Sequence, residues 1–191
     1  SDDAIIGMAG TIAKFKQELG YRVVLITFTK GETAYSSPEL KDKIAEIRKS
    51  ESQCADKILG IDVHEFWEEP TQGVVNTRAL HQSCIAAIRK YRPEIIFTHY
   101  KEDKHRDHRA ISDMVTEAWW KASEGVLTDR GAPFRAEKLY YFEVTEAFTH
   151  PDVILDITAI WDKKEKALKC FGSQEAVMGK FMKAIEGLNL Y

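Results

Sequence analysis

Short β-branched runs alternate with amphipathic segments along most of the 191-residue chain, and this alternation restricts the fold more than any other feature. The runs predicted to be strands are Val23–Phe28, Val63–Trp67, Ile95–Thr98, Lys138–Glu143 and Val153–Ile157. Apolar residues at helical spacing predict helices over residues 4–20, 39–59, 80–91, 114–122 and 160–169. Strands and helices in this order favour βαβ units. We therefore expect an α/β fold, a single Rossmann-like three-layer αβα domain over residues 1–191 with a mostly parallel sheet.

The bulk composition excludes several classes of function. A net charge of -3 provides no basic surface for a nucleic-acid backbone. No apolar run approaches the roughly 18–20 residues that a membrane-spanning helix needs. The cysteines Cys54, Cys84 and Cys170 are widely separated, which argues against a disulfide framework or a cysteine-ligated zinc site and is typical of a reducing compartment. We expect a cytoplasmic protein whose partner is a small molecule, with neither nucleic acid nor a membrane span.

Two histidines three residues apart lie where the predicted strand Ile95–Thr98 gives way to a helix. They are His105 and His108, with Asp107 between them. Open α/β sheets bind their ligands at the carboxyl ends of the strands, and imidazole is both a common metal ligand and an acid or base near neutral pH. From this segment alone, a metal or catalytic site and a polar loop that happens to contain histidines both stay open.

The first residues of the chain carry two adjacent carboxylates, Asp2 and Asp3. If a strand preceded Ser1, both would lie at the same sheet edge as the two histidines. Catalytic zinc takes such oxygen and nitrogen ligands and keeps one position open for water. A neighbouring carboxylate can then act as general base, and a second histidine can stabilise an oxyanion. By themselves, however, two aspartates near a terminus are most often a solvated helix N-cap.

Taken in order, these motifs resemble the PIG-L/LmbE-like family of zinc-dependent de-N-acetylases, which act on substrates containing N-acetylglucosamine. Ser1-Asp2-Asp3-Ala4 resembles the family's His-Pro-Asp-Asp-Glu motif without its histidine, and His105-Arg-Asp-His108 resembles its His-Pro-Asp-His motif. Thr29-Lys-Gly-Glu32, Arg48-Lys-Ser-Glu51 and Ser173-Gln174 are similar to further family segments. The resemblance extends from the first residue to about Gln174 and therefore covers most of the chain.

The resemblance implies a metal-dependent hydrolase that removes an acetyl group from an N-acetylated amino sugar. Asp3 and His108 would be ligands of zinc, or of another divalent metal, and the third ligand would be a histidine directly before Ser1. That histidine and the family's first strand are missing, and the chain stops at Tyr191 where the family continues. We therefore expect the chain to be truncated at both ends.

The same comparison implies roles for four other residues. Asp2 takes the general-base position, His105 the position that assists the tetrahedral intermediate, and Asp107 orients His105 by a hydrogen bond. Arg48 takes the position of a substrate-binding arginine. His99 directly follows a predicted strand, so it can approach the site, but a satisfied core position is favoured for it.

Two other functions are kept as alternatives. One is a catalytically silent subunit of the same fold that binds a sugar or a nucleotide, and the other is an amidase that acts on another acyl-amine. The aromatic residues and the resemblance also predict a homo-oligomer.

Overall fold

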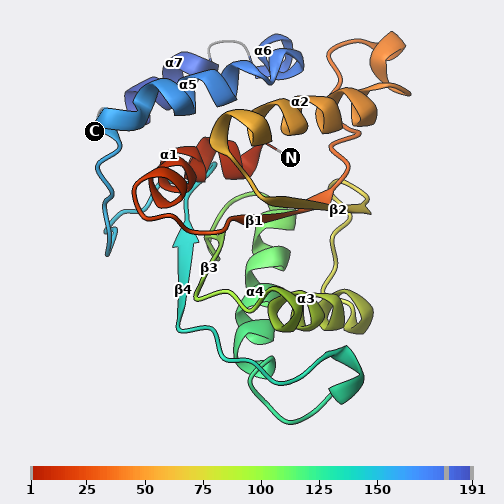
Figure 1. The fold of residues 1–191 in the computed structure, drawn as a ribbon. Helices are drawn as coiled ribbons and strands as arrows, with labels where there is room; N and C mark the ends of the chain where they lie inside the picture. Colours follow the sequence, from red (N-terminus) through yellow and green to blue (C-terminus); the bar gives the residue numbers. More distant parts are fainter. Residues whose placement is uncertain (1, 179–180, 190–191) are drawn as a thin grey trace. The chain divides into compact units, whose positions relative to one another are not determined.

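The computed structural model describes residues 2–178 and 181–189, which form α-helices and four β-strands (Figure 1). In chain order they are α1 Asp3–Gln17, β1 Val24–Thr29, α2 Ile44–Leu59, β2 Val63–Glu69, α3 Arg78–Tyr91, β3 Ile95–His99, α4 Arg106–Lys121, β4 Lys138–Phe142, α5 Trp161–Lys169, α6 Gly172–Met178 and α7 Phe181–Asn189. Contacts divide the chain into two compact units. The first comprises residues 1–71 and 151–191, and the second comprises residues 72–150. A single domain over the whole chain stays a prediction.

All described strands pair in parallel, so the predicted α/β class is confirmed. In the first unit β1 pairs with β2, from Val24 opposite Val63 to Thr29 opposite Glu69, with one irregularity before Thr29. In the second unit β3 pairs with β4 without a break, from Ile95 opposite Lys138 to His99 opposite Phe142. The described strands thus form two two-stranded sheets instead of one continuous sheet.

The predicted strand Val153–Ile157 is wrong. This segment is not paired with any described strand, and Val153 and Ile154 are 62% and 83% exposed. The side chain of its last residue, Ile157, packs closely against Gly10 of α1. A Cβ atom added at Gly10 would lie only 2.7 Å from this side chain. β-branched composition alone therefore does not create a strand, because a strand also has to pair with a neighbour.

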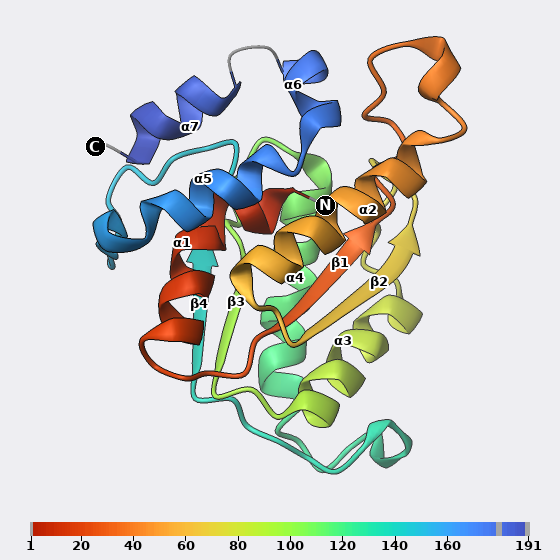
Figure 2. The same ribbon diagram turned by 45° about the horizontal axis from the view of Figure 1, so that its top comes forward.

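Helix packing builds the core of the first unit. The α1 residues Ile5, Ala9, Ile12 and Ala13 are buried on one face, as the spacing of an amphipathic helix requires. Helix α5 packs against both α1 and α2, and Figures 1 and 2 show it lying across them. Helix α2 ends at Leu59, as predicted, and its C-cap Gly60 has a left-handed conformation (φ 73°) that glycine adopts without strain.

A buried polar link ties α2 to the first sheet. His64 on β2 lies 2.8 Å through Nδ1 from the Asp56 carboxylate and 2.8 Å through Nε2 from the Thr27 hydroxyl. Its ring also stacks on Phe66 at 3.9 Å. Both ring nitrogens are occupied, so His64 is a structural histidine.

The cysteine prediction needs correction, because Cys54 and Cys170 form a disulfide across 116 residues of sequence. Packing of α5 on α2 brings their Cα atoms to 5.9 Å, a separation that a disulfide spans. Spacing along the sequence could not reveal this proximity. Cys84 is free and buried, and burial raises the pKa of its thiol to about 12. The argument for a reducing compartment therefore loses its basis. Among the described helices, none is long and apolar enough to cross a membrane.

In the second unit, one buried arginine organises the loop that follows α4. Arg89 on α3 is 4% exposed, and its guanidinium donates hydrogen bonds only to main-chain oxygens. The five acceptors are the carbonyls of Ala122, Glu124, Val126, Leu127 and Gly131. All five N–H groups of the guanidinium are used in this way. Arg89 thus fixes the loop through main-chain carbonyls and not through the loop's side chains.

Replacing Arg89 by lysine is expected to lower the free energy of unfolding by on the order of 3 kcal/mol, because a single ammonium cannot satisfy five dispersed carbonyls. Urea denaturation measures the loss. The matched control is Arg130→Lys on the same loop, where the side chain is 47% exposed, and a change within about 0.5 kcal/mol is expected there. Equal effects of the two variants would contradict this account of Arg89.

Candidate metal and catalytic site

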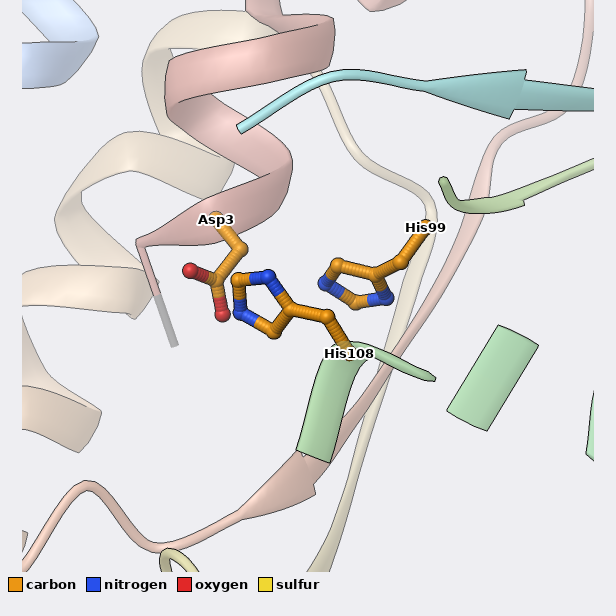
Figure 3. Close-up of side chains that lie close together, drawn as sticks. All are labelled: Asp3, His99 and His108. Atoms are coloured by element: carbon orange, nitrogen blue, oxygen red, sulfur yellow. The ribbon is translucent and has the colours of Figure 1, made fainter. Parts of the chain in front are cut away.

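Three imidazoles gather in the second unit where β3 ends and α4 begins. His99 is the last residue of β3, and its ring stacks on that of His108 with centroids 4.3 Å apart (Figure 3). His105, at the N-cap of α4, also stacks on His108, with ring centroids 4.5 Å apart. His105 and His108 thus lie at the predicted strand-to-helix junction. His99 lies beside them, whereas a core position was expected for it.

Asp103 organises this cluster. Its carboxylate lies 3.2 Å from His108 Nδ1 and accepts hydrogen bonds from the His105 backbone N–H at 2.7 Å and from Thr145 through both N–H and hydroxyl. Burial raises the pKa of Asp103, but the hydrogen bonds from Thr145, His105 and His108 outweigh burial and lower this pKa to about 2. An ionised Asp103 favours the proton of His108 on Nδ1, which leaves Nε2 as the nitrogen able to bind a metal.

The tautomer of His105 follows from a hydrogen bond within the first turn of α4. His105 Nδ1 accepts the Asp107 backbone N–H at 3.2 Å, so the proton of a neutral His105 ring is on Nε2. A ring in this state can donate a hydrogen bond from Nε2. That suits a group that stabilises negative charge on a substrate oxygen.

The role expected for the Asp107 side chain needs correction. Its buried carboxylate accepts hydrogen bonds from the backbone N–H groups of Gln72 and Val74, at 2.6 and 3.2 Å. The link from Asp107 to His105 runs through the Asp107 backbone instead. Helix geometry explains this difference, since the carboxylate leaves the helix toward the loop that precedes α3. Asp107 therefore anchors that loop and positions His105 only through its main chain.

The two aspartates at the start of the chain, which were predicted to be site residues, belong to the first unit. Asp2 is the N-cap residue of α1, yet its side chain makes no capping hydrogen bond. Its Oδ1 instead lies 2.6 Å from Nη2 of Arg48. Asp3 is the first residue of α1 and is half-buried. Ser1, which opens the same motif, lies outside the described residues.

Arg48 lies in the interior of the first unit. It is 1% exposed, and besides Asp2 it contacts Glu51 at 3.3 Å and the ring of Phe171 at 4.9 Å. The predicted site residues therefore form two groups. Asp2, Asp3 and Arg48 lie in the first unit, and the histidine cluster lies in the second.

Sequence reasoning assigned no role to Glu51, Ser173 or Thr145. The sequence signal that could have indicated a role for Glu51 and Ser173 is that both occur in segments that resemble the family. Thr145 follows β4 in a loop without any recognisable motif.

Similarity to known proteins identifies the family. A profile of the family described as "PIG-L: GlcNAc-PI de-N-acetylase" matches residues 1–119. The 4-oxalmesaconate hydratase of Pseudomonas putida is 28% identical over 92% of this chain and 71% of its own length. The 1D-myo-inositol 2-acetamido-2-deoxy-alpha-D-glucopyranoside deacetylase of Segniliparus rotundus is 27% identical over 76% of this chain, which spans 56% of that deacetylase.

The fold is shared with solved structures as well. The conserved protein TT1542 from Thermus thermophilus superposes with a TM-score of 0.87 at 29% identity, over 98% of this chain and 81% of its own. Since the profile covers more than half of the sequence, including both aspartates and the whole histidine cluster, this chain belongs to the PIG-L family of GlcNAc-PI de-N-acetylases.

Proposed function

We propose that this chain is the catalytic part of a metal-dependent hydrolase that removes the acetyl group from an N-acetylated amino sugar. Family membership and the related inositol-glucosaminide deacetylase support this choice of reaction. The observation that carries it is the histidine cluster, in which Asp103 orients His108 through Nδ1 while His105 keeps a proton on Nε2. His108 can thus bind a metal through Nε2, and His105 can donate a hydrogen bond to a developing oxyanion.

The metal ligands that we propose are Asp3 and His108, which match the family's ligand positions, together with His99, whose ring stacks on His108 within the second unit (Figure 3). Zinc accepts ligands of this kind. A histidine preceding Ser1 stays the alternative third ligand. When bound, zinc polarises an acyl oxygen and lowers the pKa of a water to about 7.

In the proposed reaction, Asp2 accepts the proton of the attacking water as a new C–O bond forms on the acetyl carbon. His105 donates a hydrogen bond from Nε2 to the carbonyl oxygen as it gains negative charge. The C–N bond then breaks, and Asp2 or His105 delivers a proton to the departing amine. The products are acetate and a free amino sugar.

A hydratase is the second candidate, because the hydratase relative aligns over 92% of this chain, more than the 76% covered by the deacetylase. Both reactions need an activated water and a group that stabilises negative charge. They differ in the acceptor, which is an amide carbonyl in one and a carbon–carbon double bond in the other. Two alternatives from the sequence also remain. An amidase would turn over a different acyl-amine, whereas a silent sugar- or nucleotide-binding subunit would turn over no substrate.

One assay separates these functions. The zinc-loaded protein is incubated with an N-acetylglucosaminyl-inositol conjugate, and acetate and primary amine are quantified. We expect equal amounts of both products, with loss of turnover after chelation and recovery on adding zinc. Water addition to 4-oxalmesaconate without acetate release would instead establish the hydratase. A protein that binds no zinc and catalyses neither reaction when zinc is added would favour the binding subunit, whereas turnover of another acyl-amine alone would establish the amidase.

Homo-oligomer formation and a cytoplasmic location stay predictions. Exposed apolar side chains, Trp120, Val153 and Ile154, offer surface that a second copy could cover. Sedimentation of the 21.8 kDa chain measures its oligomeric state.

A further inference from the structure

A chain of buried contacts in the first unit connects Asp2 to the C-terminal helices. Arg48 joins two carboxylates, with Nη2 at 2.6 Å from Asp2 and Nη1 at 3.3 Å from Glu51. The side chain of Arg48 is 2% exposed, and those of Asp2 and Glu51 are 12% and 11% exposed. Its guanidinium also lies over the ring of Phe171. Because these contacts cover its guanidinium, Arg48 has little exposed surface with which to bind a substrate.

The other end of this contact chain is Ser173, the second residue of α6. Its backbone N–H donates to Glu51 Oε1 at 2.7 Å, and its hydroxyl donates to Glu51 Oε2 at 2.8 Å. Both carboxylate oxygens of Glu51 are thus fixed by one residue, 122 positions away in the sequence. The next residue, Gln174, donates to the Ala34 carbonyl at 3.4 Å. Ser173 therefore fixes the carboxylate against which Arg48 rests.

Two observations favour a functional role over a merely structural charge cluster. The Asp2 side chain does not cap α1, although it occupies the N-cap position and aspartate is among the preferred N-cap residues. Its orientation is set by Arg48 instead. An arginine with two carboxylate neighbours is also a costly way to fill a core, since apolar residues of similar volume are often at least as stable.

We propose that Arg48 is a positioning residue for Asp2, and that Glu51 and Ser173 hold Arg48 in the orientation that Asp2 requires. This proposal rests on the proposed function in one respect, because Asp2 must be the general base. It replaces the substrate-binding role that the family resemblance implies for Arg48. The start of α6 thereby sets the geometry of a carboxylate at the start of α1.

Steady-state kinetics of Arg48→Met, Arg48→Lys, Glu51→Gln and Ser173→Ala test the proposal. A misplaced base lowers kcat, so we expect a loss of about 100-fold for Arg48→Met, partial recovery in Arg48→Lys, and a loss of about 10-fold for the other two. KM should stay within about twofold of the wild type in all four. The matched control is Lys49→Met, which removes a 40% exposed cation from the same helix and should leave kcat unchanged.

A rise in KM at unchanged kcat for Arg48→Met or Arg48→Lys would overturn the proposal and restore the substrate-binding role. If Arg48→Met does not fold, the milder Glu51→Gln and Ser173→Ala variants carry the same test. The wild type decides the proposed function separately, through its acetate release. If it catalyses hydration instead, the same kinetic comparison applies to that reaction, and a wild type without either reaction overturns both ideas.

A second readout needs neither metal nor turnover. In the metal-free protein, amide hydrogen exchange at Ser173 reports its bond to Glu51, and we expect faster exchange in Arg48→Met as well as in Glu51→Gln. Thermal unfolding of Asp2→Asn, Arg48→Met and the double variant should be non-additive, with the double variant no less stable than Arg48→Met alone. Additive shifts, or unchanged exchange in Arg48→Met, would show that the contacts are independent and would contradict the proposal.

Discussion

Replacing Asp2 by asparagine is expected to lower kcat by about 10²- to 10⁴-fold, the usual contribution of a general base, while the protein still binds its metal. Asparagine keeps the shape of the side chain but cannot accept the proton of the attacking water. Asp3→Ala and His108→Ala should behave differently, because each removes a proposed ligand and therefore the metal itself. Metal content by mass spectrometry and turnover on the N-acetylated conjugate, measured on the same samples, distinguish the two outcomes.

Asp113→Asn is the control for this comparison, since Asp113 is an exposed carboxylate on α4. It should retain both metal and turnover. Full metal occupancy in Asp3→Ala would show that Asp3 is not a ligand. Unchanged turnover in Asp2→Asn would remove Asp2 from the mechanism, and the wild-type reaction would then need another base.

Removing the Cys54–Cys170 disulfide is expected to lower the free energy of unfolding by about 4 to 5 kcal/mol, because the bond closes a loop of 116 residues. The effect arises in the unfolded chain, whose conformational freedom the cross-link restricts. The double variant Cys54→Ser/Cys170→Ser and the reduced wild type should therefore unfold at the same urea concentration. Equilibrium urea unfolding with and without reductant measures both.

The buried thiol supplies the control for this experiment. Cys84→Ala leaves the disulfide intact, so that variant should still be destabilised by reductant to the same extent as the wild type. A wild-type protein whose urea midpoint does not respond to reductant would contradict the predicted contribution of the disulfide.

Local sequence signals predicted the features that depend on neighbouring residues. The strand that ends at His99 was predicted to within one residue, whereas the following helix was predicted from Met114 onwards although α4 already begins at Arg106. Gly60 likewise ends α2 for a reason that its own backbone supplies. Features that depend on distant residues were missed or mistaken. Thr145 reaches Asp103 across 42 residues, and the side-chain direction of Asp107 is determined by a loop more than 30 residues earlier.

The strand predicted over Val153–Ile157 was wrong for the same reason. Its composition suits a strand, but a strand must also pair with a neighbouring strand, and no pattern within the segment itself can specify that partner. Arg48 shows that the same limit applies when a functional role is predicted from sequence. The family position was recognisable, whereas the depth at which its guanidinium is buried depends on Asp2, Glu51 and Phe171, which come from three separate parts of the chain.

The hydrogen bonds from Arg89 to the loop after α4 have a consequence for how this protein can diversify. Because the guanidinium binds main-chain oxygens alone, substitutions among residues 124–130 leave its acceptors in place. Gly131 is constrained, since its φ of 102° disfavours other residues and an added Cβ would lie 3.3 Å from the Arg89 side chain, and Leu127 is constrained by its left-handed backbone (φ 51°). Evolution, or a designed library, can therefore vary this loop's surface chemistry freely while its path over the molecule stays constant.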